Sequence, residues 1–199
     1  MDPIVIQAMA KWPAVPNVFG WLSLDRRGHW LIKGDRIANT GVTGFIGRNY
    51  AEDERGRWFF QNGPQRVFVQ LEYTPFVVYT AGGASMSLET HTGEPIARIS
   101  GAWMDDTGSL LLRWASAIGV VNDRDLATIA GLFTDLHARP VSDSLLARAF
   151  DAGSRRQATG VYVTYAGNRV PVGRIKVGEV AQKFGFDPAP KAKEGQPDC

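Results

Sequence analysis

The stretch RWFFQNGPQRVFVQLEY, residues 57–73, decides how this sequence folds. Apolar and polar side chains alternate on either side of Asn62-Gly63-Pro64-Gln65, which is the pattern of strands with one buried face. Asn-Gly accepts the positive φ angles that a tight hairpin turn requires. The sequence therefore predicts a β-hairpin formed by residues 57–61 and 66–73.

The same alternation extends in both directions from this hairpin. Upstream it predicts strands at 18–25 and 29–33, joined by the turn Arg26-Arg27-Gly28. Downstream, Asp105-Asp106-Thr107-Gly108 has the composition of a turn. The strands predicted downstream lie at 76–80, 85–89, 96–104, 109–114, 118–121, 161–165 and 169–172.

Helical spacing of apolar residues is confined to four short segments. They begin behind Asn39 and Thr40, at Asp123, after Ser142 and at Val177, and the last ends at Gly185. Many short strands with few helices predict the α+β class, a mainly antiparallel sheet with three or four short helices.

The same sequence patterns also indicate how the chain is organised into domains. No internal repeat is evident. We expect a single domain over residues 1–186, with a boundary near 138–142 as the alternative. Residues 151–158 have the composition of an exposed basic loop, and the Pro, Lys and Gly content of 187–199 predicts a disordered tail.

Composition excludes several classes of protein. With 44% hydrophobic and 21% charged residues, the chain is too apolar to be disordered as a whole. No window approaches the ~18 consecutive apolar residues of a membrane span, and the first residues lack a basic secretory lead. The only cysteine is Cys199, which excludes internal disulfides and thiolate zinc sites. We therefore expect a cytoplasmic protein without membrane insertion.

Charge is unevenly distributed, although the net charge is only +2. Residues 1–66 hold nine Lys and Arg against six Asp and Glu, residues 67–150 hold five against nine, and residues 151–199 hold eight against five. Two basic ends around an acidic middle can form one positive face if they meet in the fold. An ordinary mixed surface is the simpler alternative.

Familiar catalytic motifs are missing. The chain has no phosphate loop, no GxGxxG, no HExxH and no GxSxG. The segment 41–48 opens a predicted helix with three glycines and ends at Arg48, so it favours close backbone packing over anion binding. Carboxylates are the ligands that Mg²⁺ prefers, and the candidates for a metal site are Asp25, Glu72 and Asp105.

Basic residues are interleaved with aromatic ones between positions 26 and 66. Arginines pair with phosphates, and aromatic faces stack on unpaired bases, so this stretch is a candidate surface for nucleic acid or an acidic partner. A core with an ordinary charged rim is the alternative. The candidate binding residues are Arg26, Arg27, Arg48, Arg57, Gln65 and Arg66.

Two segments carry a resemblance to known proteins: WLSLDRRGHW, residues 21–30, and GRWFFQNGPQRVFV, residues 56–69. They resemble a largely uncharacterised proteobacterial family, and the likeness extends through 91–93 to 183–186. The chain also resembles plasmid fertility-inhibition proteins of the Osa and FiwA type, which suppress the export of DNA–protein substrates by a conjugative or type IV transfer apparatus.

The second resemblance implies a ParB/sulfiredoxin-like fold, with nucleotide hydrolysis and DNA cleavage that use ATP and Mg²⁺. The sequence departs from it at two points. Sulfiredoxin chemistry needs a reactive cysteine beside a phosphate-binding arginine, whereas Cys199 is in the predicted tail. The ParB-type glycine and arginine signature is matched only loosely by 63–66, which the pattern places in a hairpin.

Three functions follow as hypotheses. The first is a fertility-inhibition factor that binds DNA or a transfer-system protein. The second is a metal-dependent nuclease with nucleotide hydrolysis. The third is a non-enzymatic adaptor that uses a sheet edge or an apolar patch around residues 76–79.

Overall fold

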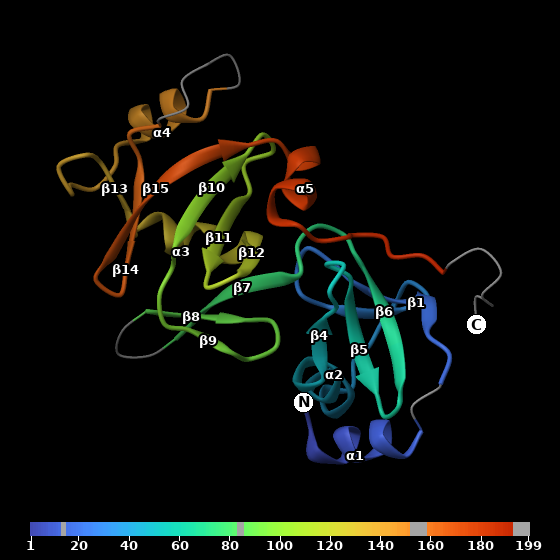
Figure 1. Cartoon of the computed structure of the whole chain (residues 1–199). Helices are drawn as coiled ribbons and strands as arrows, with labels where there is room; N and C mark the ends of the chain where they lie inside the picture. The colour runs from blue at the N-terminus through green and yellow to red at the C-terminus, as the bar shows by residue number, and fades with distance from the viewer. Residues whose placement is uncertain (13–14, 83–85, 152–158, 193–199) are drawn as a thin grey trace. The chain divides into compact units, whose positions relative to one another are not determined.

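The computed structural model describes residues 1–12, 15–82, 86–151 and 159–192 (Figure 1). The chain divides into two compact units. Unit 1 comprises residues 1–75, 91–93 and those from 184 onward, and unit 2 comprises 76–90 and 94–183. The expectation of a single domain over residues 1–186 stays a prediction, because two compact units can fold as one domain.

Unit 1 is built on a six-stranded sheet with the order β3-β2-β1-β6-β5-β4. The predicted hairpin is confirmed, since β5 and β6 pair antiparallel with Phe59 opposite Phe68 and Asn62 opposite Gln65. β6 also pairs in parallel with β1. The elements of unit 1 are α1 (Pro3–Lys11), β1 (Val18–Leu24), β2 (Trp30–Ile32), β3 (Asp35–Arg36), α2 (Thr40–Arg48), β4 (Tyr50–Glu52), β5 (Trp58–Asn62) and β6 (Gln65–Leu71).

Of the two helices of unit 1, one was predicted from the sequence and the other was not. α2 is confirmed where it was expected, and the side chain of its N-cap Asn39 accepts a hydrogen bond from the amide of Val42. α1 was not predicted. Its Pro3 stands in the first turn, where a missing N–H costs nothing, and Val5 is its buried residue.

Unit 2 is built on a nine-stranded sheet with the order β13-β14-β15-β10-β11-β12-β7-β8-β9. Leu110, Leu111 and Leu112 of β11 are all fully buried, so this central strand is covered on both faces. The elements of unit 2 are β7 (Phe76–Ala81), β8 (Ser87–Thr90), β9 (Pro95–Ile96), β10 (Gly101–Asp105), β11 (Leu110–Trp114), β12 (Ala117–Val121), η1 (Asp123–Asp125), α3 (Leu126–Ala130), β13 (Phe133–Thr134), α4 (Asp143–Ala149), β14 (Tyr162–Tyr165), β15 (Asn168–Ile175), η2 (Val177–Glu179) and α5 (Val180–Phe184).

The predicted fold class was wrong. The described chain is mostly β rather than α+β, with five short α-helices, and both sheets are mixed because each combines antiparallel pairs with parallel ones. Parallel pairs join β1 to β6, β7 to β12 and β10 to β15. Alternation shows which face of a strand is buried, but it does not show which distant strand lies beside it or in which direction.

One turn recurs along the chain with the pattern Asp-x-x-Gly-x. In residues 25–29, 53–57 and 105–109 the aspartate carboxylate accepts the amide hydrogens of the third and fifth residues. The fourth residue is a glycine with a φ of 78°, 73° and 86°, respectively. In 135–139 the same bonds form although Ala138 holds the fourth place, at a φ of 60°.

These turns explain two predicted features. The turns at 26–28 and 105–108 are confirmed, and each closes a hairpin through bonds within five residues, such as Asp25 N–H to His29 O. The fifth residue often bonds back to the aspartate, as His29 Nδ1 does to Asp25 Oδ2 at 2.8 Å. The carboxylate at the first position of each turn therefore accepts hydrogen bonds from the backbone of that turn.

The expectations for the apolar patch, the C-terminal tail and the basic loop have different outcomes. The apolar patch around 76–79 was wrong as a docking surface, because Phe76, Val77 and Val78 are buried in β7 between two neighbouring strands. Residues 187–192 of the predicted tail are described and belong to unit 1, where Pro188 O accepts the amide of Leu71 and the amide of Asp187 donates to Gly56 O. Cys199 and most of the predicted basic loop at 151–158 lie outside the described residues.

Candidate binding site

The six binding residues expected from the sequence all belong to unit 1, but they lie at separate places. Arg26 and Arg27 are in the turn 25–29, where the Arg26 guanidinium lies 4.1 Å from the ring centre of Tyr73. Arg48 ends α2 and forms an ion pair with Asp2 at 3.2 Å. Of the six, Arg57 and Arg66 line the same cavity.

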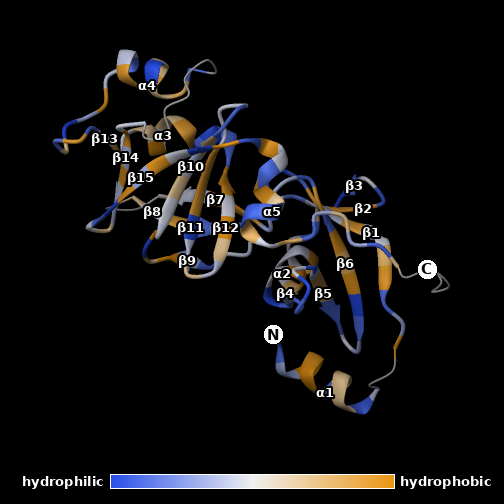
Figure 2. Ribbon diagram, turned by 45° about the horizontal axis from the view of Figure 1, so that its top comes forward, coloured by the Kyte–Doolittle hydropathy of each residue, from blue (hydrophilic) through white to orange (hydrophobic). Residues whose placement is uncertain are grey.

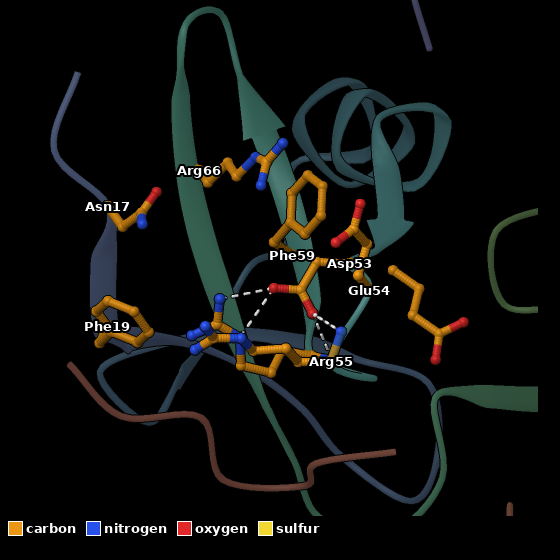
Figure 3. A pocket seen from close by; sticks show the side chains of 9 residues that line it. Asn17, Phe19, Asp53, Glu54, Arg55, Phe59 and Arg66 are labelled. Carbon is orange, nitrogen blue, oxygen red and sulfur yellow. Dashed lines mark hydrogen bonds and ion pairs between the residues drawn. The ribbon is translucent and has the colours of Figure 1, made fainter. Parts of the chain in front are cut away.

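This cavity, which we call the arginine pocket, has a volume of about 550 Å³ (Figure 3). It is formed by the start of β1, the turn 53–57 and the strands β5 and β6. Three arginines and three carboxylates surround an aromatic floor. Its lining residues are Asn17, Phe19, Glu52, Asp53, Glu54, Arg55, Arg57, Phe59 and Arg66.

The turn 53–57 holds Arg57 in one position. Asp53 Oδ1 accepts the amides of Arg55 and Arg57, and Asp53 Oδ2 accepts both Nε and an Nη of Arg57 at 2.9 and 2.7 Å. This two-pronged pairing, which dashed lines mark in Figure 3, engages two donors of one guanidinium group. Arg57 is therefore a structural member of the pocket wall.

Aromatic rings support both arginines. The Arg57 guanidinium lies 4.4 Å from the ring centre of Phe68, and Phe19 stacks on Phe68 at 4.6 Å with an interplanar angle of 3°. The Arg66 guanidinium lies 4.6 Å from the ring centre of Phe59. A cation over an aromatic face is attracted by the ring quadrupole, so each ring favours the observed position of its guanidinium group.

The pKa values of Asp53 and Glu52 in the pocket are shifted in opposite directions. Burial alone would raise the pKa of Asp53, but hydrogen bonds from the Arg57 side chain and the turn amides outweigh it and lower that pKa. Burial raises the pKa of Glu52, and the nearby charge of Asp53 adds to this effect. The charge of Asp53 is thus matched by Arg57, whereas Glu52 and Glu54 remain at the rim.

Arg66 differs from its neighbours in what it contacts. Within the described ranges its guanidinium has the Phe59 ring against one face and forms no ion pair. Its edge therefore keeps donors that a carboxylate or phosphate can accept in pairs. Sequence reasoning identified both Arg57 and Arg66, but it could not distinguish the paired arginine from the available one.

A second cavity of unit 1 was missed by the sequence analysis. It has a volume of about 400 Å³, and we call it the apolar groove. Gln65 lies at its rim and donates a hydrogen bond to Pro16 O at 3.2 Å. The groove is lined by Val18, Trp21, Leu22, Ile32, Val42, Ile46, Phe60, Asn62, Gln65 and Val67. Its signal in the sequence was the apolar face of the strand 18–24.

The candidate metal ligands are not assembled into one site. Glu72 accepts the amide of Arg26, Asp25 belongs to the turn 25–29, and Asp105 accepts two amides and the Thr107 hydroxyl in the turn 105–109 of unit 2. In the parts of the chain that the structure describes, no three His, Cys, Asp or Glu residues are placed to hold a metal ion. Mg²⁺ and ATP stay expectations from the resemblance.

An aromatic cluster that includes the buried Trp30 lies on the opposite face of β5 from the arginine pocket. Tyr50 is its centre, with ring centroids 4.8 Å from Trp58, 5.1 Å from Trp30 and 5.9 Å from His91. The Tyr50 hydroxyl donates to Pro75 O at 3.1 Å. Desolvation lowers the pKa of His91 to about 3, against a smaller opposing effect of Asp25. This histidine is therefore neutral at physiological pH.

These features define a β-rich chain of two units, the first of which carries an arginine pocket and an apolar groove. The chain belongs to the family DUF2944, whose description reads "Protein of unknown function (DUF2946)" and whose model matches residues 1–191. No curated protein matches the sequence. No helix of the described residues is both long and apolar enough to cross a membrane.

Two solved structures are similar to the chain. A DUF1285 family protein from Silicibacter pomeroyi DSS-3 is 15% identical, with a TM-score of 0.50 over 87% of this chain and 96% of that one. A DUF1285 family protein from Shewanella baltica OS155 is 14% identical, with a TM-score of 0.42 over 54% and 87%. The first likeness concerns the fold alone. It shows that the ParB/sulfiredoxin-like fold implied by the resemblance was wrong.

Proposed function

We propose that this chain is a non-enzymatic binding protein that captures an acidic group of a protein partner in the arginine pocket. The observation that carries the proposal is Arg66, whose guanidinium lies over the Phe59 ring at 4.6 Å and forms no ion pair among the described residues. A fixed guanidinium loses little conformational freedom on binding, so its donors are prepared for a two-pronged contact.

The composition of the pocket favours a discrete acidic group over a nucleic acid. Arg57 is already matched by Asp53, and Arg48, elsewhere in unit 1, is matched by Asp2. Glu52 and Glu54 at the rim would repel the continuous row of phosphates that a DNA strand presents. A single Asp, Glu or phosphorylated side chain of a protein brings one acidic group instead of a row of them, so it meets less of this repulsion.

The fertility-inhibition role fits this proposal as one case. The resemblance to inhibitors of conjugative transfer suggests that the partner belongs to a transfer apparatus, and the binding mode needs no DNA contact. A mating assay tests this part: expression of the chain in a donor should lower conjugation frequency, and Arg66→Ala should restore it. The metal-dependent nuclease stays a prediction, which incubation of plasmid with the protein and Mg²⁺, with and without EDTA, would test.

The binding proposal itself is tested by NMR titration of the ¹⁵N-labelled chain with a blocked peptide rich in Asp and Glu. Amide shifts should centre on residues 17–19, 52–59 and 66. Arg66→Ala should lower the affinity for the peptide at least about tenfold, as expected when one partner of a charged pair is removed. Arg66→Lys should retain part of the affinity because it keeps the charge and loses the fork.

The matched control is Arg36→Ala, which removes an exposed arginine outside the pocket. It should leave peptide binding unchanged. A single-stranded DNA oligonucleotide provides the contrast, because a nucleic-acid surface has an affinity that falls steeply with salt. If DNA binds with a steep salt slope while the peptide does not bind, the acidic-protein proposal is wrong.

A further inference from the structure

Exposed large apolar side chains are concentrated in unit 1. Of the eight in the described ranges, seven belong to this unit, and the eighth is Leu136. They form two groups. The first is on and beside α1 and consists of Met1, Ile4, Ile6 and Trp12. The second is at the mouth of the apolar groove and consists of Trp21, Ile32 and Val42, each more than 40% exposed.

The two groups have opposite shapes. α1 is a convex helix that is anchored to its own unit by Val5, and its first turn is strongly hydrophobic (Figure 2). Pro3, Ile6 and Ala10 are exposed and spaced three and four residues apart, so they form one outward apolar stripe. The groove is a concave site with an apolar lining, and no residue of α1 lines it.

From this self-complementarity we infer that the groove receives the outward stripe of α1 from a second copy of the chain. A helix seated in an apolar groove is a common mode of recognition. Two such contacts related by a two-fold axis would cover Ile6 and the mouth of the groove on both copies, which is the arrangement of a closed dimer. A flat lipid surface could cover the stripe of α1, but it could not fill a concave groove.

Charge supports the same occupant. Lys11 ends α1, and Asp35 of β3 stands opposite Ile32 at the groove mouth. Both side chains are exposed, and within the described residues neither forms an ion pair. In the dimer the terminus of α1 that carries Lys11 meets the rim that carries Asp35, so the apolar contact gains an ion pair at its edge.

The test is sedimentation equilibrium of the full chain over about 1 to 100 µM, where mass action separates a dimer from a monomer. The unaltered chain should be dimeric at the upper end. Ile6→Glu and Ile32→Lys should each weaken dimerisation at least about tenfold, because each places a charge in an apolar contact. Leu136→Glu is the matched control in unit 2 and should leave the dimer unchanged.

Mixing the two variants gives a sharper result. In a mixed dimer, the unaltered α1 of the Ile32→Lys copy meets the unaltered groove of the Ile6→Glu copy, and the other contact pairs Glu with Lys. The mixture should therefore associate more tightly than either variant alone. Circular dichroism confirms that the variants are folded.

Three outcomes would overturn the inference. They are an unaltered chain that is monomeric throughout, a dimer that neither variant weakens, and a mixture no tighter than its components. Binding of the monomeric chain to phosphatidylcholine vesicles through Ile6 alone would assign α1 to a lipid surface. The Arg66 titration is independent of this result, because none of the altered residues lines the arginine pocket.

Discussion

The carbonyl oxygen of Gly185 lies 2.1 Å from the point that a Cβ atom on Gly56 would occupy. Gly56 is the fourth residue of the turn 53–57, with a φ of 73°, and its own carbonyl accepts the amide of Asp187 at 2.8 Å. The segment that follows α5 therefore packs directly on the turn that positions Arg57.

Gly56→Ala should destabilise the chain by roughly 2 to 4 kcal/mol, because it combines a left-handed alanine with a collision against backbone. Gly108→Ala is the matched control. Gly108 has the same place in the turn 105–109 and a φ of 86°, but nothing lies within 4 Å of its added Cβ. The control should cost about 1 to 2 kcal/mol from conformation alone. Equal losses of unfolding free energy in urea would contradict the proposed collision.

Ala138→Gly should stabilise the chain. Ala138 holds the fourth place of the turn 135–139 at a φ of 60°, is exposed and stands where the related turns have glycine. Glycine would remove the left-handed strain, and its greater freedom in the unfolded chain offsets part of the gain. The expected net change is about 0.5 to 1 kcal/mol in urea unfolding, and a loss of stability would show that the alanine is not strained.

His91 should make the folded chain sensitive to acid. Its pKa is about 3 in the folded chain, against the ordinary value of 6.5. Between these values the unfolded chain binds a proton that the folded chain does not, so the free energy of unfolding falls as the pH drops from 6.5 towards 3. Each unit of pKa difference corresponds to about 1.4 kcal/mol.

His91→Gln removes this titration, and the pH dependence of unfolding should become flatter across the same interval. The comparison concerns the slope, because the substitution also changes packing beside Trp30 and Tyr50. Parallel slopes for the two chains would mean that the pKa of His91 is the same in the folded and the unfolded chain.

Asp105 should stabilise the folded chain through the turn 105–109. Its Oδ1 atom accepts the amides of Thr107 and Ser109 and the Thr107 hydroxyl, each at 2.8 Å. Asp105→Ala should cost about 2 to 3 kcal/mol, because it leaves turn donors without this acceptor, and Asp105→Asn should cost less. Addition of Mg²⁺ should change neither value. A stabilising effect of Mg²⁺ that Asp105→Ala abolishes would instead make Asp105 a metal ligand.

Local features of the fold could be predicted from the sequence. The hairpin of residues 57–73 carries its own signals, since Asn62-Gly63 supplies the turn and alternation supplies the strands. The helix of residues 40–48 was indicated by its cap. α1 was missed because its first residues lack an amphipathic contrast, with Ile4, Val5 and Ile6 in succession.

Long-range features could not be predicted in the same way. β11 is buried on both faces, so Leu110, Leu111 and Leu112 show no alternation, and nothing local to β10 indicates that β15 lies beside it. The candidate site shows the same limit. Arg57 and Arg66 were identified by residue type. The ion pair of Arg57 with Asp53 and the contact of Arg66 with the Phe59 ring form only in the folded chain.

β10 pairs in parallel with β15, with Ala102 opposite Val172. One edge of β10 therefore stays unpaired during synthesis until β15 has been made. Until residues 168–175 have left the ribosome, β10 presents open N–H and C=O groups that can recruit another nascent chain. A chain that ends before Asn168 would lack β15, so this edge of β10 would stay unpaired. Truncated products of this protein should accordingly depend on chaperones and accumulate in inclusion bodies.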